Sequence, residues 1–310
     1  MPVEVSVIMS VWNGAATVGR ALESALSQRF TDYEIIVADD GSSDATPDIL
    51  KTYAGRIRIV TCPHRGIGPA RTAAIAASNG EYLAFLDADD IWLPDKLAHT
   101  APLLDRDPGC VLVYSDATLV NDDGLTVGTY VAPEAAHAPS LEEMLRRYWP
   151  ILESMTLIRR AAFDQAGGFW PGSWRSSGVG FLWMRARELG HFHYVPERLV
   201  LLHARPYPQY IDINNDSRAL LFRLVRERYG WTKSRRLRRG MYREINRDHL
   251  HHLNHLGLIA MRERRGVEAR GHFMRALRHN PGNIKTALRL MRTFLPAPLA
   301  RALTGRTRAA

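Results

Sequence analysis

The sequence has few cysteines and no long apolar run, which argues against a protein stabilised by disulfides and against one that spans a membrane. Its two cysteines, Cys62 and Cys110, form no CxxC pair and imply no disulfide framework. No stretch approaches the ~18 apolar residues of a membrane span. Residues 1–10 lack the basic flank and long apolar core of a signal peptide. Together these absences predict a protein of the reducing cytoplasm.

Two phosphate-binding motifs are also missing. No GxGxxG stands between the strand predicted over residues 5–10 and the helix predicted over residues 17–28, which disfavours a dinucleotide-binding enzyme. The GxxxxGK motif followed by Ser or Thr is absent as well. A diphosphate bound by this chain must therefore be neutralised by a metal ion and by side chains such as Arg71, because no glycine loop is available.

The net charge of +9 is divided unevenly along the chain. Residues 1–217 contain 18 Lys and Arg against 27 Asp and Glu, whereas residues 218–310 contain 23 against 5. The first part is therefore acidic and the last strongly basic, which indicates an anionic surface as a partner of the basic part. A solvated helical tail without a ligand is the alternative explanation.

Short apolar runs alternate with helical patterns through the first hundred residues. Residues 5–10 form a nearly continuous apolar run, which is typical of a strand buried on both faces. Further strands are predicted over 33–38, 56–61 and 81–86, with helices over 17–28, 46–53 and 69–78 and a loop at 66–68. This alternation predicts an α/β fold with a doubly wound, mainly parallel sheet flanked by helices.

The pattern changes near residue 216. Before it, the sequence predicts a helix over 96–104, a strand over 111–115, a hairpin turn over 121–124 and helices over 141–148 and 181–189. After it, long Arg-rich helical stretches predict a second domain, so we expect domains at 1–215 and 216–310. Residues 256–280 have the pattern of one tetratricopeptide-type helical hairpin, with ordinary helix packing as the alternative.

Acidic side chains follow two of the predicted strands at the point where each strand ends. Asp39 and Asp40 close the second strand, and Asp87 and Asp89 close the fourth. In an open parallel sheet, ligands bind at the carboxyl ends of the strands. Aspartates crowded there repel one another unless a positive charge lies between them, and a hard divalent cation is the simplest answer. Turn-forming aspartates are the alternative for either cluster taken alone.

Three segments carry a specific resemblance over residues 3–100. They read SVIMSVWNG, EIIVADDGSSDAT and GPARTAAIAASNGEYLAFLDADDIWLPDKL, in this order. In these segments the chain resembles the family 2 glycosyltransferases of the GT-A fold, and the resemblance thins out towards residue 205. It implies an inverting transferase that takes a sugar from a nucleotide-diphosphate donor, usually UDP-linked, with Mn2+ or Mg2+ as cofactor.

The resemblance also implies roles in donor binding. Asp40 is expected to accept the N3–H of uracil, and Asp87 to contact the ribose. Asp89 is expected to bind the metal ion that bridges the diphosphate. Arg71 lies where a contact to base or phosphate is expected, with a surface helix arginine as the alternative. The base site is expected to be shaped by Ser10, Val11, Trp12 and Asp39.

The general base is where the sequence departs from the family pattern. Inverting transfer needs a base that removes the proton of the acceptor hydroxyl. Similar proteins have a Glu-Asp pair after a Gly-Gly-Phe turn, but here Gly178 and Val179 occupy those places. Glu153 is our candidate base, and the alternative is a glutamate that is merely exposed or paired with an arginine. A nucleophilic acceptor such as a phosphate, or binding without turnover, would explain the missing pair equally well.

A histidine provides a second candidate metal ligand. Similar enzymes often carry Arg-x-His-Pro in this region, whereas this chain has His203-Ala-Arg205-Pro206. A spacing of two keeps both side chains on one face of a strand. His203 is therefore a candidate metal ligand, and a buried, hydrogen-bonded histidine is the alternative.

These observations lead to one main hypothesis and two others. We expect a glycosyltransferase that acts on a cell-envelope polysaccharide, a lipid-linked acceptor or a metabolite. The first alternative is a protein that binds nucleotide sugars without turnover. The second, nucleic-acid binding by the basic part, lacks a recognition motif and a stacking pattern. Basic residues beside short apolar stretches near residues 218–247 and 294–303 instead favour peripheral contact with an anionic membrane at its inner face.

Overall fold

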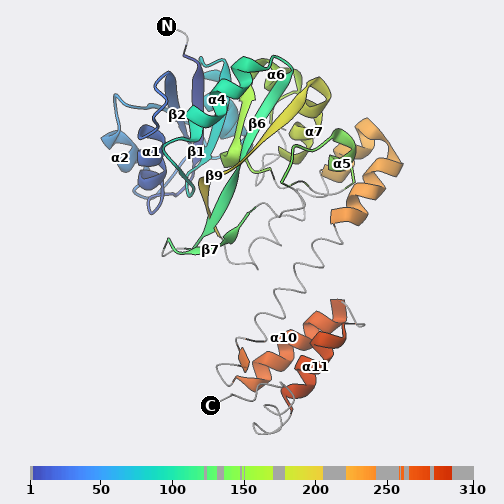
Figure 1. Ribbon diagram of the computed structural model, residues 1–310. Helices are drawn as coiled ribbons and strands as arrows, with labels where there is room; N and C mark the ends of the chain where they lie inside the picture. The colour runs from blue at the N-terminus through green and yellow to red at the C-terminus, as the bar shows by residue number, and fades with distance from the viewer. Residues whose placement is uncertain are drawn as a thin grey trace, which may run out of the picture. The chain divides into compact units, whose positions relative to one another are not determined.

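Strand–helix units open the chain, as the sequence predicted. A computed structural model shows β1 (Val5–Val11), β2 (Tyr33–Asp39) and β3 (Arg58–Thr61) in parallel, joined through α1 (Val18–Leu26) and α2 (Thr46–Thr52) (Figure 1). The structure describes residues 3–121, 124–130, 136–146, 149, 151–169, 179–204, 221–241, 258, 260–261, 265–279 and 283–294.

These strands belong to one mixed sheet, and the first four strands in its spatial order are parallel to one another. Its strand order is β3-β2-β1-β4-β8-β6-β9-β5, and β7 pairs with β6 off this path. β4 runs parallel to β1, whereas β8 is antiparallel to both β4 and β6. The strands not yet defined are β4 (Tyr82–Asp87), β5 (Ile91–Trp92), β6 (Cys110–Val120), β7 (Thr126–Thr129), β8 (Thr156–Arg159) and β9 (His191–His203).

Helices pack against this sheet and bury its central strands. Every residue of β1 is buried, and five of its seven residues are apolar, with Ser6 and Ser10 as the exceptions. α1 contributes an apolar stripe that includes Val18, Leu22 and Ala25. The remaining helices of the unit with defined ends are α3 (Ile67–Ala76), α4 (Lys96–Arg106), α5 (Leu141–Met144), η2 (Glu153–Met155), α6 (Arg160–Gln165) and α7 (Val179–Leu189).

Several elements differ from the sequence prediction. β5 and β8 were not predicted, and β9 was expected only as a strand at His203, although it is 13 residues long and runs parallel to β6 through several irregularities of register. Exposed positions and Pro196 interrupt its apolar pattern, so no periodic signal marks it. The predicted loop at 66–68 is shorter than expected, because Gly66 has a φ of 95° and α3 begins at Ile67. Gly66 can adopt this backbone conformation since it has no Cβ.

The chain divides into two compact units, residues 1–237 and 238–310. The predicted boundary between residues 215 and 216 lies outside the described residues. In the second unit, α10 (Gly266–His279) and α11 (Ile284–Arg292) pack around a small core that includes Ala269 and Phe273. The predicted hairpin over 256–280 is described only in part. Among the described residues, no helix is long and apolar enough to cross a membrane.

Candidate functional site

The register of the parallel strands brings the predicted donor-site residues together. Ser10 at the end of β1 lies beside Ala38 of β2 on one side and beside Asp87 of β4 on the other. Val11 is paired with Asp39, the last residue of β2. Three strands therefore end at one edge of the sheet, which is where ligands bind in folds of this type.

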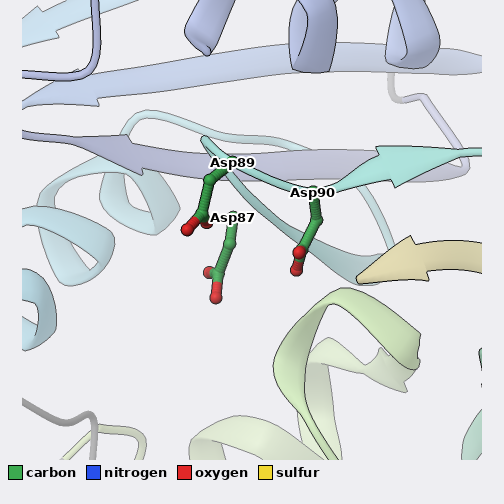
Figure 2. A group of neighbouring side chains, drawn as sticks. All are labelled: Asp87, Asp89 and Asp90. Atoms are coloured by element: carbon green, nitrogen blue, oxygen red, sulfur yellow. The ribbon is translucent and has the colours of Figure 1, made fainter. Parts of the chain in front are cut away.

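Three carboxylates gather in the turn that follows β4. Asp87, Asp89 and Asp90 each offer one oxygen, and these oxygens all lie within 4.8 Å of one another. Figure 2 shows the three side chains extending to the same side of the turn. The turn is held by a hydrogen bond from the Asp90 N–H to the Asp87 carbonyl oxygen (3.1 Å). The predicted Asp-x-Asp pair thus becomes a cluster of three.

Asp90 was not predicted as a site residue, although it follows Asp89 directly in the acidic run. It is only 6% exposed. Its Oδ1 accepts a hydrogen bond from the backbone N–H of His203 (2.9 Å), and its Oδ2 accepts one from the hydroxyl of Ser154 (2.5 Å). Burial, followed by the charges of Asp87 and Asp89, raises the pKa of this carboxyl well above its ordinary range. Asp90 therefore ties β9 and η2 to the acidic turn.

His203 lies at the border of the carboxylate cluster. Its Nδ1 is 3.9 Å from Asp89 Oδ2, and its backbone N–H is fixed by Asp90. The side chains of His203 and Asp89 are both about one-fifth exposed, so both reach the surface of the site. The structure thus brings together the two residues that were predicted as metal ligands. Arg205, its predicted companion, lies outside the described residues.

Arg71 joins two predicted residues that are far apart in the sequence. It is fully buried, which rules out the alternative of a surface helix arginine. Its Nη1 donates to Glu153 Oε1 (2.6 Å), and its Nη2 donates to Asp87 Oδ1. The guanidinium also lies over the ring of Phe169, 5.5 Å from its centroid. Arg71 therefore holds Glu153 and the acidic turn in a fixed relation.

The η2 segment carries the candidate base into the site. Glu153 is buried there beside Arg71. The next residue, Ser154, accepts a hydrogen bond from the Asp87 N–H (3.0 Å), donates one to Asp90, and accepts one at its carbonyl oxygen from the Trp92 indole. This role of Ser154 could not be predicted, since a lone serine has no distinctive sequence pattern. Glu153 is thus anchored within the same network as the carboxylate cluster.

Asp40 and Asp39 organise the loops at the ends of β1, β2 and β3. Asp39 Oδ1 accepts a hydrogen bond from the Ser42 N–H (3.0 Å). The Asp40 carboxylate accepts from the N–H groups of Arg65 and Gly66, both at 2.9 Å, and its Oδ2 lies 2.9 Å from His64 Nδ1. Asp40 therefore shapes the loop before α3 in addition to any contact with a ligand.

An aromatic stack stands beside Asp40. The rings of Trp12 and His64 are stacked, with centroids 4.4 Å apart and planes 18° from parallel. Trp12 is nevertheless 54% exposed, so the stack offers a flat surface to solvent. Asn13, with a φ of 50°, fixes this loop by accepting hydrogen bonds from the N–H groups of Ser43 and Asp44. The sequence pointed to Trp12 but not to His64.

The donor set fits a hard divalent cation. Besides Asp90, whose raised pKa favours the neutral form, the described site holds the carboxylates of Asp87, Asp89 and Glu153 against one buried arginine, so negative charge is still in excess. Asp90 already accepts two hydrogen bonds from the protein, and Asp87 is paired with Arg71. Asp89 is therefore best placed to supply the carboxylate oxygen that Mn2+ and Mg2+ prefer, and His203 lies beside it as a further candidate ligand.

The expected acidic pair has no counterpart in the described part of this region. α7 begins at Val179, at one of the two places where the pair is expected, and the residues just before it lie outside the described residues. Trp183 of α7 is buried and donates its indole N–H to the Ile151 carbonyl oxygen (3.1 Å), which joins α7 to the segment that leads into η2. Glu153 is thus the candidate base that the structure brings to the acidic turn.

Comparison with protein families gives a match over the same region. The family described as "Glycosyl transferase family 2" matches residues 6–166, which include both acidic clusters, Arg71 and Glu153.

Curated relatives match over part of their length. The chain is 34% identical over 140 residues to the succinoglycan biosynthesis protein ExoO of Rhizobium meliloti (strain 1021), covering 44% of this chain and 40% of that protein. It is 33% identical over 132 residues to the UDP-Glc:alpha-D-GlcNAc-diphosphoundecaprenol beta-1,3-glucosyltransferase WfgD of Escherichia coli, covering 42% and 51%. The chain thus aligns with about half or less of each relative.

Solved structures share the fold. S. aureus TarS 1-349 in complex with UDP-GlcNAc matches with a TM-score of 0.57 and 18% identity, covering 72% of this chain and 66% of that one. The mannosyltransferase PcManGT from Pyrobaculum calidifontis, in complex with GDP-Man and Mn2+, matches with a TM-score of 0.56 and 19% identity, covering 73% and 64%. These matches confirm the predicted α/β architecture of GT-A type.

Proposed function

Because the chain belongs to glycosyl transferase family 2, we propose that it transfers a sugar from a nucleotide-diphosphate donor to an acceptor hydroxyl with inversion. The observation that carries the proposal is the arrangement at the end of β4. Asp87, Asp89 and Asp90 cluster there, and Arg71 joins the cluster to Glu153. Negative charge gathered at the carboxyl edge of a parallel sheet suits a cation-assisted diphosphate site.

We assign the nucleoside to the edge formed by β1 and β2. Asp40 accepts the N3–H of uracil in this proposal, and Trp12 covers the base, since aromatic rings favour stacking. Ser10, Val11 and Asp39 form the floor of the base site, and Asp87 contacts the ribose. The TarS complex with UDP-GlcNAc supports a UDP-sugar as donor. The PcManGT complex with GDP-Man supports a GDP-sugar as the alternative.

Asp89 and His203 would hold the divalent cation. A cation bound there supplies positive charge that neutralises the diphosphate leaving group. The Mn2+ in the PcManGT complex supports Mn2+, with Mg2+ as the alternative. Arg71 binds two carboxylates at the base of the site and keeps Asp87 oriented, so the protein provides a preorganised frame for the donor.

Glu153 is our proposed general base. The η2 segment brings its carboxylate beside the acidic turn, where it can accept the proton of an acceptor hydroxyl. Its pairing with Arg71 also supports the alternative in which Glu153 only positions Arg71 and the acceptor is already nucleophilic, for example a phosphate. Glu153→Gln separates the two roles, because glutamine keeps a hydrogen-bond acceptor for Arg71 but cannot take up the proton.

The two roles of Glu153 predict different kinetics in slow hydrolysis of the donor. If Glu153 is the base, Glu153→Gln lowers the hydrolysis rate by about 10²-fold or more while donor affinity stays close to that of the wild type. If Glu153 only positions Arg71, Glu153→Gln keeps the hydrogen bond to Arg71, so the hydrolysis rate and the donor affinity both stay close to those of the wild type. The second outcome would remove Glu153 from catalysis without changing the proposed donor site.

Cell-envelope glycans and lipid-linked sugars are the proposed acceptors. The names of ExoO and WfgD point to succinoglycan biosynthesis and to a diphosphoundecaprenol-linked sugar, respectively. A small metabolite is the alternative. The predicted cytoplasmic location and the contact of residues 218–247 and 294–303 with the inner face of a membrane stay predictions, because those segments are described only in part.

A donor screen tests the proposed function. Thermal unfolding is measured with UDP, GDP and their sugars, each with and without Mn2+. The proteins compared are the wild type, Asp89→Ala and the control Asp48→Ala, which changes an exposed position of α2. We expect a UDP-sugar to stabilise wild type and control in a Mn2+-dependent way, and slow release of UDP from that donor. No stabilisation by any nucleotide sugar would refute the donor site. Binding without any release of nucleoside diphosphate would favour the non-catalytic alternative.

A further inference from the structure

The helix α11 exposes a stripe of apolar side chains. Ile284, Leu288 and Met291 are 73, 51 and 56% exposed. They recur at intervals of four and three residues, so they lie on one face of the helix. Thr286 and Leu290 lie on the opposite side, where Thr286 is fully buried and Leu290 packs against the small core of the unit. α11 thus buries one face within its own unit and presents the other to solvent.

Basic side chains run beside this apolar stripe. Lys285, Arg289 and Arg292 follow one another along α11 at the same four- and three-residue intervals, on the neighbouring face. Residues 265–294 contain seven Lys and Arg but one acidic residue, Glu268, which is paired with Arg265. The segment that contains α10 and α11 therefore carries a strong excess of positive charge, and three of its basic side chains lie on α11 beside the stripe.

The combination identifies the kind of surface that α11 fits. Apolar side chains enter the boundary between headgroups and acyl chains, while Lys and Arg beside them approach anionic headgroups. A second copy of the chain would match the apolar stripe but would bring like charges together. Nine residues of helix are about 14 Å long, which is too short to cross a bilayer. We therefore expect α11 to lie parallel to the surface of an anionic bilayer, where both its apolar and its basic side chains find partners.

We propose that α11 is an interfacial helix that binds the protein to anionic membranes through Ile284, Leu288 and Met291, with Lys285 and its basic neighbours contacting lipid phosphates. This surface is formed by residues of the second unit, and none of them is among the residues assigned to the donor site. Membrane binding by this surface can be tested alone, without donor or acceptor.

The test is co-sedimentation of the full chain with vesicles of phosphatidylcholine, with and without phosphatidylglycerol, at low and high ionic strength. The variant Ile284→Ser/Leu288→Ser/Met291→Ser removes the stripe, and its three positions are exposed, so we expect unchanged thermal unfolding. The control Leu125→Ser/Val127→Ser removes two exposed apolar side chains near β7. We expect wild type and control to bind anionic vesicles at low salt, and the triple variant to bind about tenfold or more weakly.

Three outcomes would overturn the proposal. The first is absence of binding to anionic vesicles at low ionic strength. The second is equal binding by wild type and the triple variant, which would leave the basic side chains alone as the cause. The third is self-association that the triple variant abolishes in the absence of vesicle binding, measured by sedimentation velocity, which would assign the apolar stripe to a second copy. Loss of donor binding in the tests above would leave all three readouts unaffected.

Discussion

Replacing Lys96 with methionine should stabilise the protein, and the gain should disappear at high pH. Lys96 lies at the start of α4, fully buried, and its Nζ has no hydrogen-bond partner among the described residues. The amine lies over the ring of Trp92, with the ring centroid 5.7 Å from Nζ. Burial lowers the pKa of this amine from 10.5 to about 7. Methionine keeps a long apolar side chain but has no proton to bind.

The magnitude follows from proton linkage. Between pH 7 and 10.5 the unfolded chain binds the Lys96 proton and the folded chain releases it, so the free energy of unfolding rises with pH in this window. Below pH 7 both states bind the proton and the cost is at its largest. The lowered pKa of Lys96 reduces the free energy of unfolding by roughly 4 kcal/mol at pH 7 and by about 1 kcal/mol at pH 10. Lys96→Met should remove this cost.

Chemical unfolding of wild type and variant at several pH values measures the difference directly. We expect Lys96→Met to be more stable by roughly 4 kcal/mol at pH 7, with the gap closing by about 3 kcal/mol towards pH 10. Lys51→Met is the control, since Lys51 is exposed and paired with Asp48 on the surface, and we expect a change of less than about 1 kcal/mol at either pH. If the free energy of unfolding of Lys96→Met differed from that of the wild type by the same amount from pH 7 to 10, the lowered pKa of the buried Lys96 amine would be refuted.

Three further substitutions probe the donor site. Asp89→Ala should abolish the Mn2+ dependence of UDP-sugar binding measured by calorimetry, and unchanged dependence would show that the metal site is wrongly assigned. Asp40→Ala should weaken binding of free UDP even without metal, and normal UDP affinity would argue against the base contact. The same change should lower the thermal midpoint, because the N–H groups of Arg65 and Gly66 lose their acceptor. Arg71→Met should destabilise the fold by about 3–5 kcal/mol in urea, since it leaves buried carboxylates unpaired, and a neutral result would contradict the ion-pair network.

The strands and their acidic ends were predictable because their signals are local. The nearly continuous apolar run of β1 indicates burial on both faces, and Asp39 and Asp87 are simply the last residues of largely apolar strands. A parallel sheet aligns the carboxyl ends of its strands, so the proximity of Ser10 to Asp87 follows from topology alone. Aspartates crowded at that edge then indicate a cation, a matter of charge that does not depend on the details of packing.

The partners of these side chains were decided by the tertiary structure. Arg71 and Glu153 are 82 positions apart, and Asp90 meets the backbone of His203 across 113 positions. No periodicity reports such contacts, because they depend on how η2 and β9 pack against the acidic turn. For the same reason, Arg71 has the sequence context of an ordinary helix residue but is fully buried. Local sequence fixes the strand pattern and the position of the acids, whereas long-range packing determines which charges meet and which of them are shielded from water.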